Sequence, residues 1–277
     1  NQTAAFSYAK DQTRNTLEIP PEKIFPEGQW STLMGKRGIT AWTVEDKEYC
    51  YSSYGQTVGK GFTAVPTNGQ LNEGLTIINK IIRENKKSKN YIYFYYAGLD
   101  SCLHQYGSRS KKAKGEIKMI KKQLARFLKQ KLNYRKNTLF ILTADHGQID
   151  IDPQKTFYLN KEIPEIMEMI RENNEGKKLF IGGSCRAAFL YLKPEWIEKA
   201  LFLLKEKLSK IALVDRSNEI IKLDHHQERI GDILIRPLSN YTVWWYEKDI
   251  YEVIYPSCHG GISQEEREIP FLTQELK

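Results

Sequence analysis

Two apolar runs separated by an amphipathic segment constrain the fold of this chain more than any other feature of its sequence. YIYFYY at residues 91–96 and TLFILTA at 138–144 are aromatic and β-branched, which is typical of parallel strands covered on both faces. Between them, apolar residues recur at helical spacing, at Ile117, Ile120, Leu124, Phe127, Leu128 and Leu132. This order predicts a right-handed βαβ crossover in one parallel sheet and therefore an α/β protein.

The composition is that of an ordinary globular protein and argues against general disorder. The chain has 277 residues, 40% of them hydrophobic and 27% charged, which allows one large domain or two small ones. A net charge of +8 favours acidic partners. However, the lysines lie in mixed runs such as RENKKSK, typical of solvated helix faces. We therefore expect a small substrate and no stable nucleic acid complex.

Four cysteines, Cys50, Cys102, Cys185 and Cys258, lie far apart and form no Cys-x-x-Cys pair. They indicate neither a disulfide framework nor a zinc ribbon, and they fit a reducing compartment. A cytoplasmic location is expected, and an extracytoplasmic one stays open because the chain begins with Asn1 and not with Met. No apolar run approaches the roughly 20 residues of a membrane helix, and no signal peptide is visible.

The remaining segments predict a three-part organisation. Residues 1 to 70 are rich in turn formers and aromatics and should form short helices and strands, before an amphipathic helix from Leu71. Beyond Asp150, KLFIGGSCRAAFLYLK predicts a bent strand pair, PEWIEKALFLLKEKLSKI a helix opened by Pro194, and ALVDRSNEIIKL a hairpin. We expect a main domain at 1–152, a small α+β lid inserted at 153–230, and a return to the main domain at 231–277.

Three of the histidines, with two neighbouring aspartates, are the candidate residues for a catalytic metal site. Asp100 and His104 follow the first apolar run, Asp145 and His146 end the second, and His259 precedes two glycines. Ligands of parallel sheets gather outside the carboxyl ends of the strands, where both Asp-His pairs are expected. Carboxylate together with imidazole suits zinc or a similar divalent cation in a catalytic site. The four-residue gap places Asp100 and His104 on one face if the turn between them is helical.

Each of these residues also has a purely structural interpretation. Asp145 could cap the following segment beside a surface His146, Asp100 could cap the helix that carries His104, and His259 could be a turn residue. It is less probable that all three places, the two Asp-His pairs and His259, combine these residue types by accident than that they form one site. The remaining pair, His225 and His226 in LDHHQE, is interpreted as the polar end of a hairpin in the lid.

Four motifs occur in the order LDSCLHQYG, ILTADHGQ, RIGDILI and CHGGISQEEREIPFL. Together they resemble the type I phosphodiesterase and nucleotide pyrophosphatase family of the alkaline phosphatase superfamily, and the resemblance runs from about Ile77 to Leu272. It implies a three-layer αβα sheet with a small lid. It also implies two divalent metals, usually zinc, with manganese, magnesium or iron as alternatives, that clamp a phosphoryl group of a phosphodiester or nucleotide.

Carried over by position, the resemblance assigns the five candidate residues to two metals. Asp100, His104 and His259 would hold one metal, and Asp145 and His146 would hold part of the other. Two glycines, Gly107 and Gly260, match family positions that shape loops. Asp232 in RIGD also matches a family position, and we interpret it as structural. Cys102 and Cys258, which lie within two of the motifs, are interpreted as packing residues.

Two residues that the family needs are not found in the sequence. These are an aspartate that completes the second metal site and a threonine or serine that attacks phosphorus. Thr3 lacks the pattern that follows the family nucleophile, and Thr67 lies too far downstream. We expect both to belong to an N-terminal segment that is absent from this chain or supplied by another chain.

The functional hypothesis is hydrolysis of phosphodiester or nucleotide pyrophosphate bonds by the intact protein. Because fold does not fix the substrate, a phosphomonoesterase, phosphonate hydrolase, sulfatase or mutase of the same superfamily is the alternative. A non-catalytic nucleotide- or RNA-binding protein is a further alternative, compatible with the net charge of +8.

Overall fold

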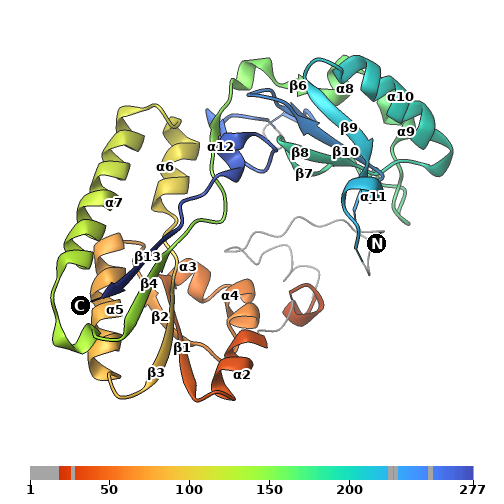
Figure 1. Cartoon of the computed structure of the whole chain (residues 1–277). Coiled ribbons are helices and arrows are strands. Elements are labelled where there is room, and N and C mark those ends of the chain that lie inside the picture. Colours follow the sequence, from red (N-terminus) through yellow and green to blue (C-terminus); the bar gives the residue numbers. More distant parts are fainter. Residues whose placement is uncertain (1–18, 26–28, 224–226, 228–229, 249–251, 277) are drawn as a thin grey trace. The chain divides into compact units, whose positions relative to one another are not determined.

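The structure, a computed structural model, describes residues 19–25, 29–223, 227, 230–248 and 252–276 (Figure 1). It combines helices with parallel and antiparallel strands, so the predicted α/β class is confirmed. The chain divides into two compact units. We call residues 4–99, 115–141 and 272–277 the sheet unit, and residues 1–3, 100–114 and 142–271 the cluster unit.

The sheet unit contains a parallel sheet of three strands in the order β2-β1-β3 and a second sheet that pairs β13 with β4. Its elements in chain order are η1 Pro21–Lys23, α2 Gln29–Gly35, β1 Ile39–Asp46, α3 Lys47–Cys50, α4 Ser53–Val58, β2 Thr63–Thr67, α5 Leu71–Glu84, β3 Lys89–Phe94, η2 Asn133–Arg135, β4 Thr138–Leu142 and β13 Leu272–Leu276. The short helices and strands expected before residue 70 are confirmed for the described residues.

The helix expected from Leu71 is confirmed as α5, and its apolar face forms the core of the sheet unit. Leu71 and Leu75 pack with Phe127, and Phe94 of β3 lies against this cluster. Gly74 lets the helix approach the strand closely, because a Cβ there would lie 2.3 Å from the Phe94 ring. Burial of such side chains contributes about 1.5–3 kcal/mol each.

Two expectations about the strands are wrong for the described residues. Tyr91 and Tyr93 of β3 are 41% and 45% exposed, and Leu139 and Ile141 of β4 are 58% and 53% exposed, so each strand is covered on one face only. In addition, β4 pairs with β13 and not within the sheet of β3, so the predicted crossover in one sheet is not formed. Apolar runs show that both faces can be buried, but not which partner covers them.

The cluster unit contains an antiparallel sheet in the order β7-β8-β10-β9. Its core comes from apolar residues of this sheet and of α10, among them Leu190, Leu204, Leu208 and Ile233. The elements are α6 Gly98–Tyr106 and α7 Lys111–Lys129, which both cross the unit boundary, then β5 Ile149–Asp150, η3 Pro153–Lys155, β6 Phe157–Tyr158, α8 Leu159–Glu162, α9 Ile166–Met169, β7 Gly182–Ser184, β8 Ala187–Leu190, η4 Pro194–Trp196, α10 Ile197–Leu208, β9 Ala212–Arg216, α11 Ser217–Ile220, β10 Ile233–Pro237, β11 Val243–Trp244, β12 Ser257–Cys258 and α12 Gln264–Arg267.

Most local predictions for this unit are confirmed. The bent strand pair is β7 and β8, and Pro194 opens a 3-10 turn that continues into α10. The predicted hairpin at ALVDRSNEIIKL is wrong, because β9 is followed by the helical turn α11 and pairs with β10. The sheet thus extends past residue 230, and the three-part division with a lid stays a prediction. Within the described residues, we find no helix with the length and apolar character needed to cross a membrane.

Candidate metal centre

Helix α6 carries the first two candidate ligands. Asp100 and His104 lie one helical turn apart and therefore face the same side, with His104 Nε2 at 3.4 Å from Asp100 Oδ1. The helix ends at Tyr106, and the N–H of the next residue, Gly107, donates to the carbonyl of Leu103 at 2.8 Å. Gly107 has a φ of 80°, a left-handed conformation that glycine adopts without the strain of a Cβ.

His146 lies in the loop that follows β4, where close backbone packing fixes its position. The N–H of Gly147 donates to the carbonyl of Glu266 at 2.8 Å. A Cβ on Gly147 would lie 1.9 Å from the carbonyl oxygen of Glu265, so only glycine fits there. The Nε2 of His146 lies 3.6 Å from Asp145 Oδ2. The Asp-His pair is therefore held against the loop that precedes and includes α12.

His259 follows β12, which pairs with β5 through Ser257 and Asp150. Its imidazole stacks on that of His146, with ring centroids 3.5 Å apart and an angle of 10° between the planes. Its Nε2 lies 3.8 Å from Asp100 Oδ1. Segments far apart in the sequence thus bring Asp100, His146 and His259 together, with potential ligand atoms within 4.8 Å of one another.

The grouping differs from the division that the resemblance implies. His146 lies with Asp100 and His259, whereas the resemblance assigns it with Asp145 to another metal. His104 and Asp145 touch this group through the 3.4 Å and 3.6 Å contacts to Asp100 and His146. The division of the five residues between two metals, and their role as ligands, stay predictions.

Hydrogen bonds at the far side of two rings favour metal binding by the near side. Nδ1 of His104 lies 2.9 Å from the carbonyl oxygen of Ser257, and Nδ1 of His146 lies 2.9 Å from that of Gly147. A carbonyl only accepts, so Nδ1 carries the hydrogen and Nε2 of the neutral ring keeps its lone pair. Both Nε2 atoms face a carboxylate oxygen, and two electron-rich atoms repel unless a proton or a cation lies between them.

The polar atoms of the group also fit a cation. Asp100 Oδ1 is buried and accepts no hydrogen bond from any described residue, although buried carboxylate oxygens are normally satisfied. Burial lowers the pKa of His259, and the neighbouring His146 lowers it further. A neutral imidazole is the form that binds a metal. Carboxylate and imidazole donors suit zinc, iron or manganese.

A buried ion pair fixes the loop that carries His259. Arg186 and Glu266 are 0% and 3% exposed, and Arg186 donates from Nε at 2.9 Å and from Nη2 at 2.7 Å to the carboxylate. The same carboxylate accepts from the N–H of Gly261 at 2.9 Å and of Ser263 at 3.2 Å. Burial alone would raise the pKa of Glu266, but the hydrogen bonds from Arg186, Ser263 and Gly261 outweigh it and lower the pKa.

Sequence reasoning missed this pair, although one signal was present. Ser263 and Glu266 form a capping box at the start of α12, and the spacing Ser-x-x-Glu in the sequence is its signature. Asp150 was also missed. Its Oδ1 accepts from the N–H of Ser108 at 2.6 Å and holds the turn after α6. Arg186 gave no comparable signal, because its partner lies 80 positions away.

The other singled-out residues do not belong to this group, and three of them lie outside the described residues. These three are Thr3, His225 and His226. Thr67 is buried at the end of β2 in the sheet unit. Asp232 accepts from the N–H of Leu192 at 2.7 Å, a contact that agrees with a structural role.

The structure shows the backbone conformation of the two motif glycines and the neighbour of the motif cysteine Cys258. Gly260 has a φ of 104°, so the family glycines Gly107 and Gly260 both adopt left-handed backbone. Cys258 lies near Cys185, with sulfurs 3.4 Å apart. Cys185 donates a hydrogen bond to the Cys258 sulfur, and this bond together with burial raises the pKa of the Cys185 thiol. Both are free cysteines.

Fold and site together define an α/β protein with a candidate centre for a divalent metal, built from carboxylate and imidazole groups. The sequence profile of the type I phosphodiesterase / nucleotide pyrophosphatase family matches residues 26–257. The chain belongs to this family. A search of curated proteins gave no match.

Solved structures share the fold at low sequence identity. Murine ectonucleotide pyrophosphatase / phosphodiesterase 5 is 16% identical with a TM-score of 0.62, over 88% of this chain and 62% of that one. The human protein of the same name is 14% identical with a TM-score of 0.61, over 88% and 62%. Phosphonoacetate hydrolase from Sinorhizobium meliloti, in complex with phosphonoformate, is 18% identical with a TM-score of 0.59, over 87% and 66%. The chain therefore spans less than two thirds of the length of each.

Proposed function

We propose that the intact protein hydrolyses phosphodiester or nucleotide pyrophosphate bonds at a metal-dependent site. The observation that carries the proposal is the group of Asp100, His146 and His259 in a chain of this family, with Asp100 Oδ1 buried and free of hydrogen bonds among the described residues. One structure of the murine relative is that of an inactive variant in complex with AMP, which supports a nucleotide as substrate or product.

The chain's own residues would hold and orient the metals. Two divalent ions, with zinc as the first candidate, would neutralise charge on the phosphoryl oxygens. Asp100 supplies a carboxylate oxygen, and His146 and His104 are oriented by the carbonyls of Gly147 and Ser257 so that Nε2 is the donor atom. Burial and the stacked His146 lower the pKa of His259, which favours the uncharged ring that a metal binds.

The nucleophile is proposed to be a threonine or serine hydroxyl outside the motifs matched here. Its attack on phosphorus would form a phosphoryl-oxygen bond as the leaving alkoxide or phosphate departs, and water would then hydrolyse the covalent intermediate. The chain's contribution is the ligand set and the loops that position it.

A phosphonate hydrolase is the second candidate, because phosphonoacetate hydrolase structures in complex with phosphonoacetate and phosphonoformate share the fold. Substrate selection among these enzymes depends on contacts beyond the metal centre, so the fold supports both candidates.

Turnover of bis-p-nitrophenyl phosphate, p-nitrophenyl phosphate and phosphonoacetate by the protein in its full natural length tests the proposal. We expect the diester to react fastest, with loss of activity on chelation and return of activity on addition of zinc. Faster turnover of the monoester or of phosphonoacetate would contradict the diesterase assignment. Absence of bound metal by elemental analysis would favour a non-catalytic nucleotide-binding protein.

A further inference from the structure

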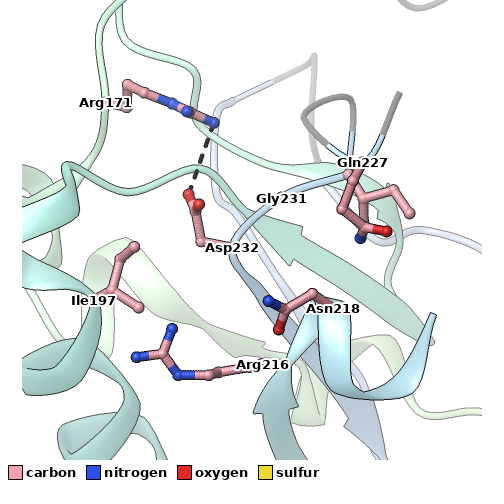
Figure 2. Close-up of a pocket in the computed structure, with 8 residues that line it drawn as sticks. Arg171, Ile197, Arg216, Asn218, Gln227, Gly231 and Asp232 are labelled. Atoms are coloured by element: carbon pink, nitrogen blue, oxygen red, sulfur yellow. Dashed lines mark ion pairs between the residues drawn. The ribbon is translucent and has the colours of Figure 1, made fainter. Parts of the chain in front are cut away.

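A pocket in the cluster unit shares no residue with the metal centre. Figure 2 shows it between α10, β9, α11 and the start of β10. Its volume is about 260 Å³, and its lining includes Arg171, Arg216, Asn218, Ile197 and Asp232. This is slightly below the range of roughly 300–1,000 Å³ for ligand sites, so the pocket suits a small molecule.

Arg171 has donors that the described protein does not satisfy. Its Nη2 lies 3.7 Å from Asp232 Oδ2, an ion pair too long for a hydrogen bond (Figure 2). Its Nε is buried and has no hydrogen-bond partner among the described residues. A guanidinium presents five N–H donors in a planar fork, and a buried donor without an acceptor is unfavourable. An oxyanion in the pocket would supply an acceptor to the terminal nitrogens of Arg171, of which Nη2 has only this long contact among the described residues.

Arg216 is only loosely held by protein groups. It forms an ion pair with Glu198, whose side chain is 74% exposed, and exposed pairs of this kind contribute little. Asp232 differs, because its carboxylate is committed to the N–H of Leu192 at 2.7 Å. Among the described residues of the lining, the charged ones are two arginines and one aspartate, a net charge of +1.

We propose that this pocket binds a small organic oxyanion, a carboxylate or a phosphate ester, through Arg171 and Arg216. Arginine forks match the oxygen spacing of both groups. Ile197 gives the pocket an apolar wall for a short carbon body, and the amide of Asn218 adds a polar contact. Since Asp232 would repel a second negative group, a ligand with one anionic end is favoured over a polyanion.

Isothermal titration calorimetry with inorganic phosphate, glycerol 3-phosphate and lactate tests this site. The protein is treated with a chelator first, so that the metal centre does not bind the probes. We expect saturable binding of at least one probe, and a Kd raised about 10- to 100-fold in Arg171→Met and in Arg216→Met. Arg171→Lys keeps the charge but loses the fork, and it replaces Arg171→Met if that variant does not fold.

The matched control is Arg83→Met, because Arg83 is an exposed arginine of the sheet unit paired with Glu84. Its Kd should equal that of the unchanged protein. Binding of glycerol 3-phosphate alone would identify a phosphate site, and binding of lactate alone a carboxylate site. The absence of saturable binding for all three probes, or equal Kd values in the arginine variants, would overturn the proposal.

Discussion

Two polar groups of the cluster unit, which meet in the segment that carries His259 and Glu266, differ in how well they are satisfied. The pair of Arg186 and Glu266 is almost fully buried, and its carboxylate accepts four hydrogen bonds from Arg186, Gly261 and Ser263. In the candidate metal centre, Asp100 Oδ1 is buried and accepts no hydrogen bond from the described residues, and the Asp-His contacts are 3.4 to 3.8 Å long. Protein groups satisfy the first group, whereas the second has a carboxylate oxygen without a donor among the described residues, and we propose that a cation binds there.

The largest effect is expected from breaking the satisfied pair. Arg186→Met leaves the carboxylate of Glu266 buried and unpaired, so the free energy of unfolding should fall by about 3–5 kcal/mol. Urea unfolding measures this change. The control Arg83→Met removes an exposed pair whose atoms are 3.6 Å apart, and it should cost less than about 1 kcal/mol. Equal losses in both variants would mean that the buried pair has no special role.

Substitutions in the candidate metal centre should instead lower the affinity for metal and leave the free energy of unfolding almost unchanged. Asp100→Asn should weaken zinc binding about 100-fold, because it removes the charge at the centre of the group. The more exposed Asp145 should matter less, and Asp145→Asn should weaken binding about 10-fold. Competition titration with a chromogenic chelator measures both affinities.

In metal-free protein, Asp100→Asn should leave the free energy of unfolding unchanged or slightly higher, since Asp100 Oδ1 has no hydrogen-bond donor to lose among the described residues. Unchanged zinc affinity in both variants would refute the ligand assignment. A large loss of stability in the metal-free Asp100→Asn variant would remove the contrast between the two groups.

The smallest effect concerns the pH dependence of the satisfied pair. The hydrogen bonds to Glu266 outweigh burial and hold its pKa below the ordinary value of 4.5. A lowered folded pKa means that the carboxylate stabilises the fold above the unfolded pKa, and that this contribution is lost as pH falls through the folded pKa. The difference in unfolding free energy between the protein and Glu266→Gln should therefore be constant near pH 7 and shrink below about pH 4. A difference that grows on acidification would show the opposite sign of the shift.

Much of the local structure was predictable because it depends on residues close in sequence. The apolar periodicity of α5 predicted its start at Leu71, and Pro194 predicted the start of the segment that becomes α10. The four-residue spacing of Asp100 and His104 gave their common face once the segment was helical. The prediction of a hairpin in ALVDRSNEIIKL was wrong because contacts distant in sequence decide which strands pair, and β9 pairs with β10.

The sequence by itself determined the α/β class, the family and the residue types of the candidate centre. Such information is carried by periodicity and by motifs in fixed order. Only the tertiary structure decided that His146 stacks on His259 beside Asp100, and that Arg186 is buried against Glu266. It also decided that one face of β3 and of β4 is exposed. The reason is physical: burial and pairing depend on which distant segments share the space, and one sequence does not state this.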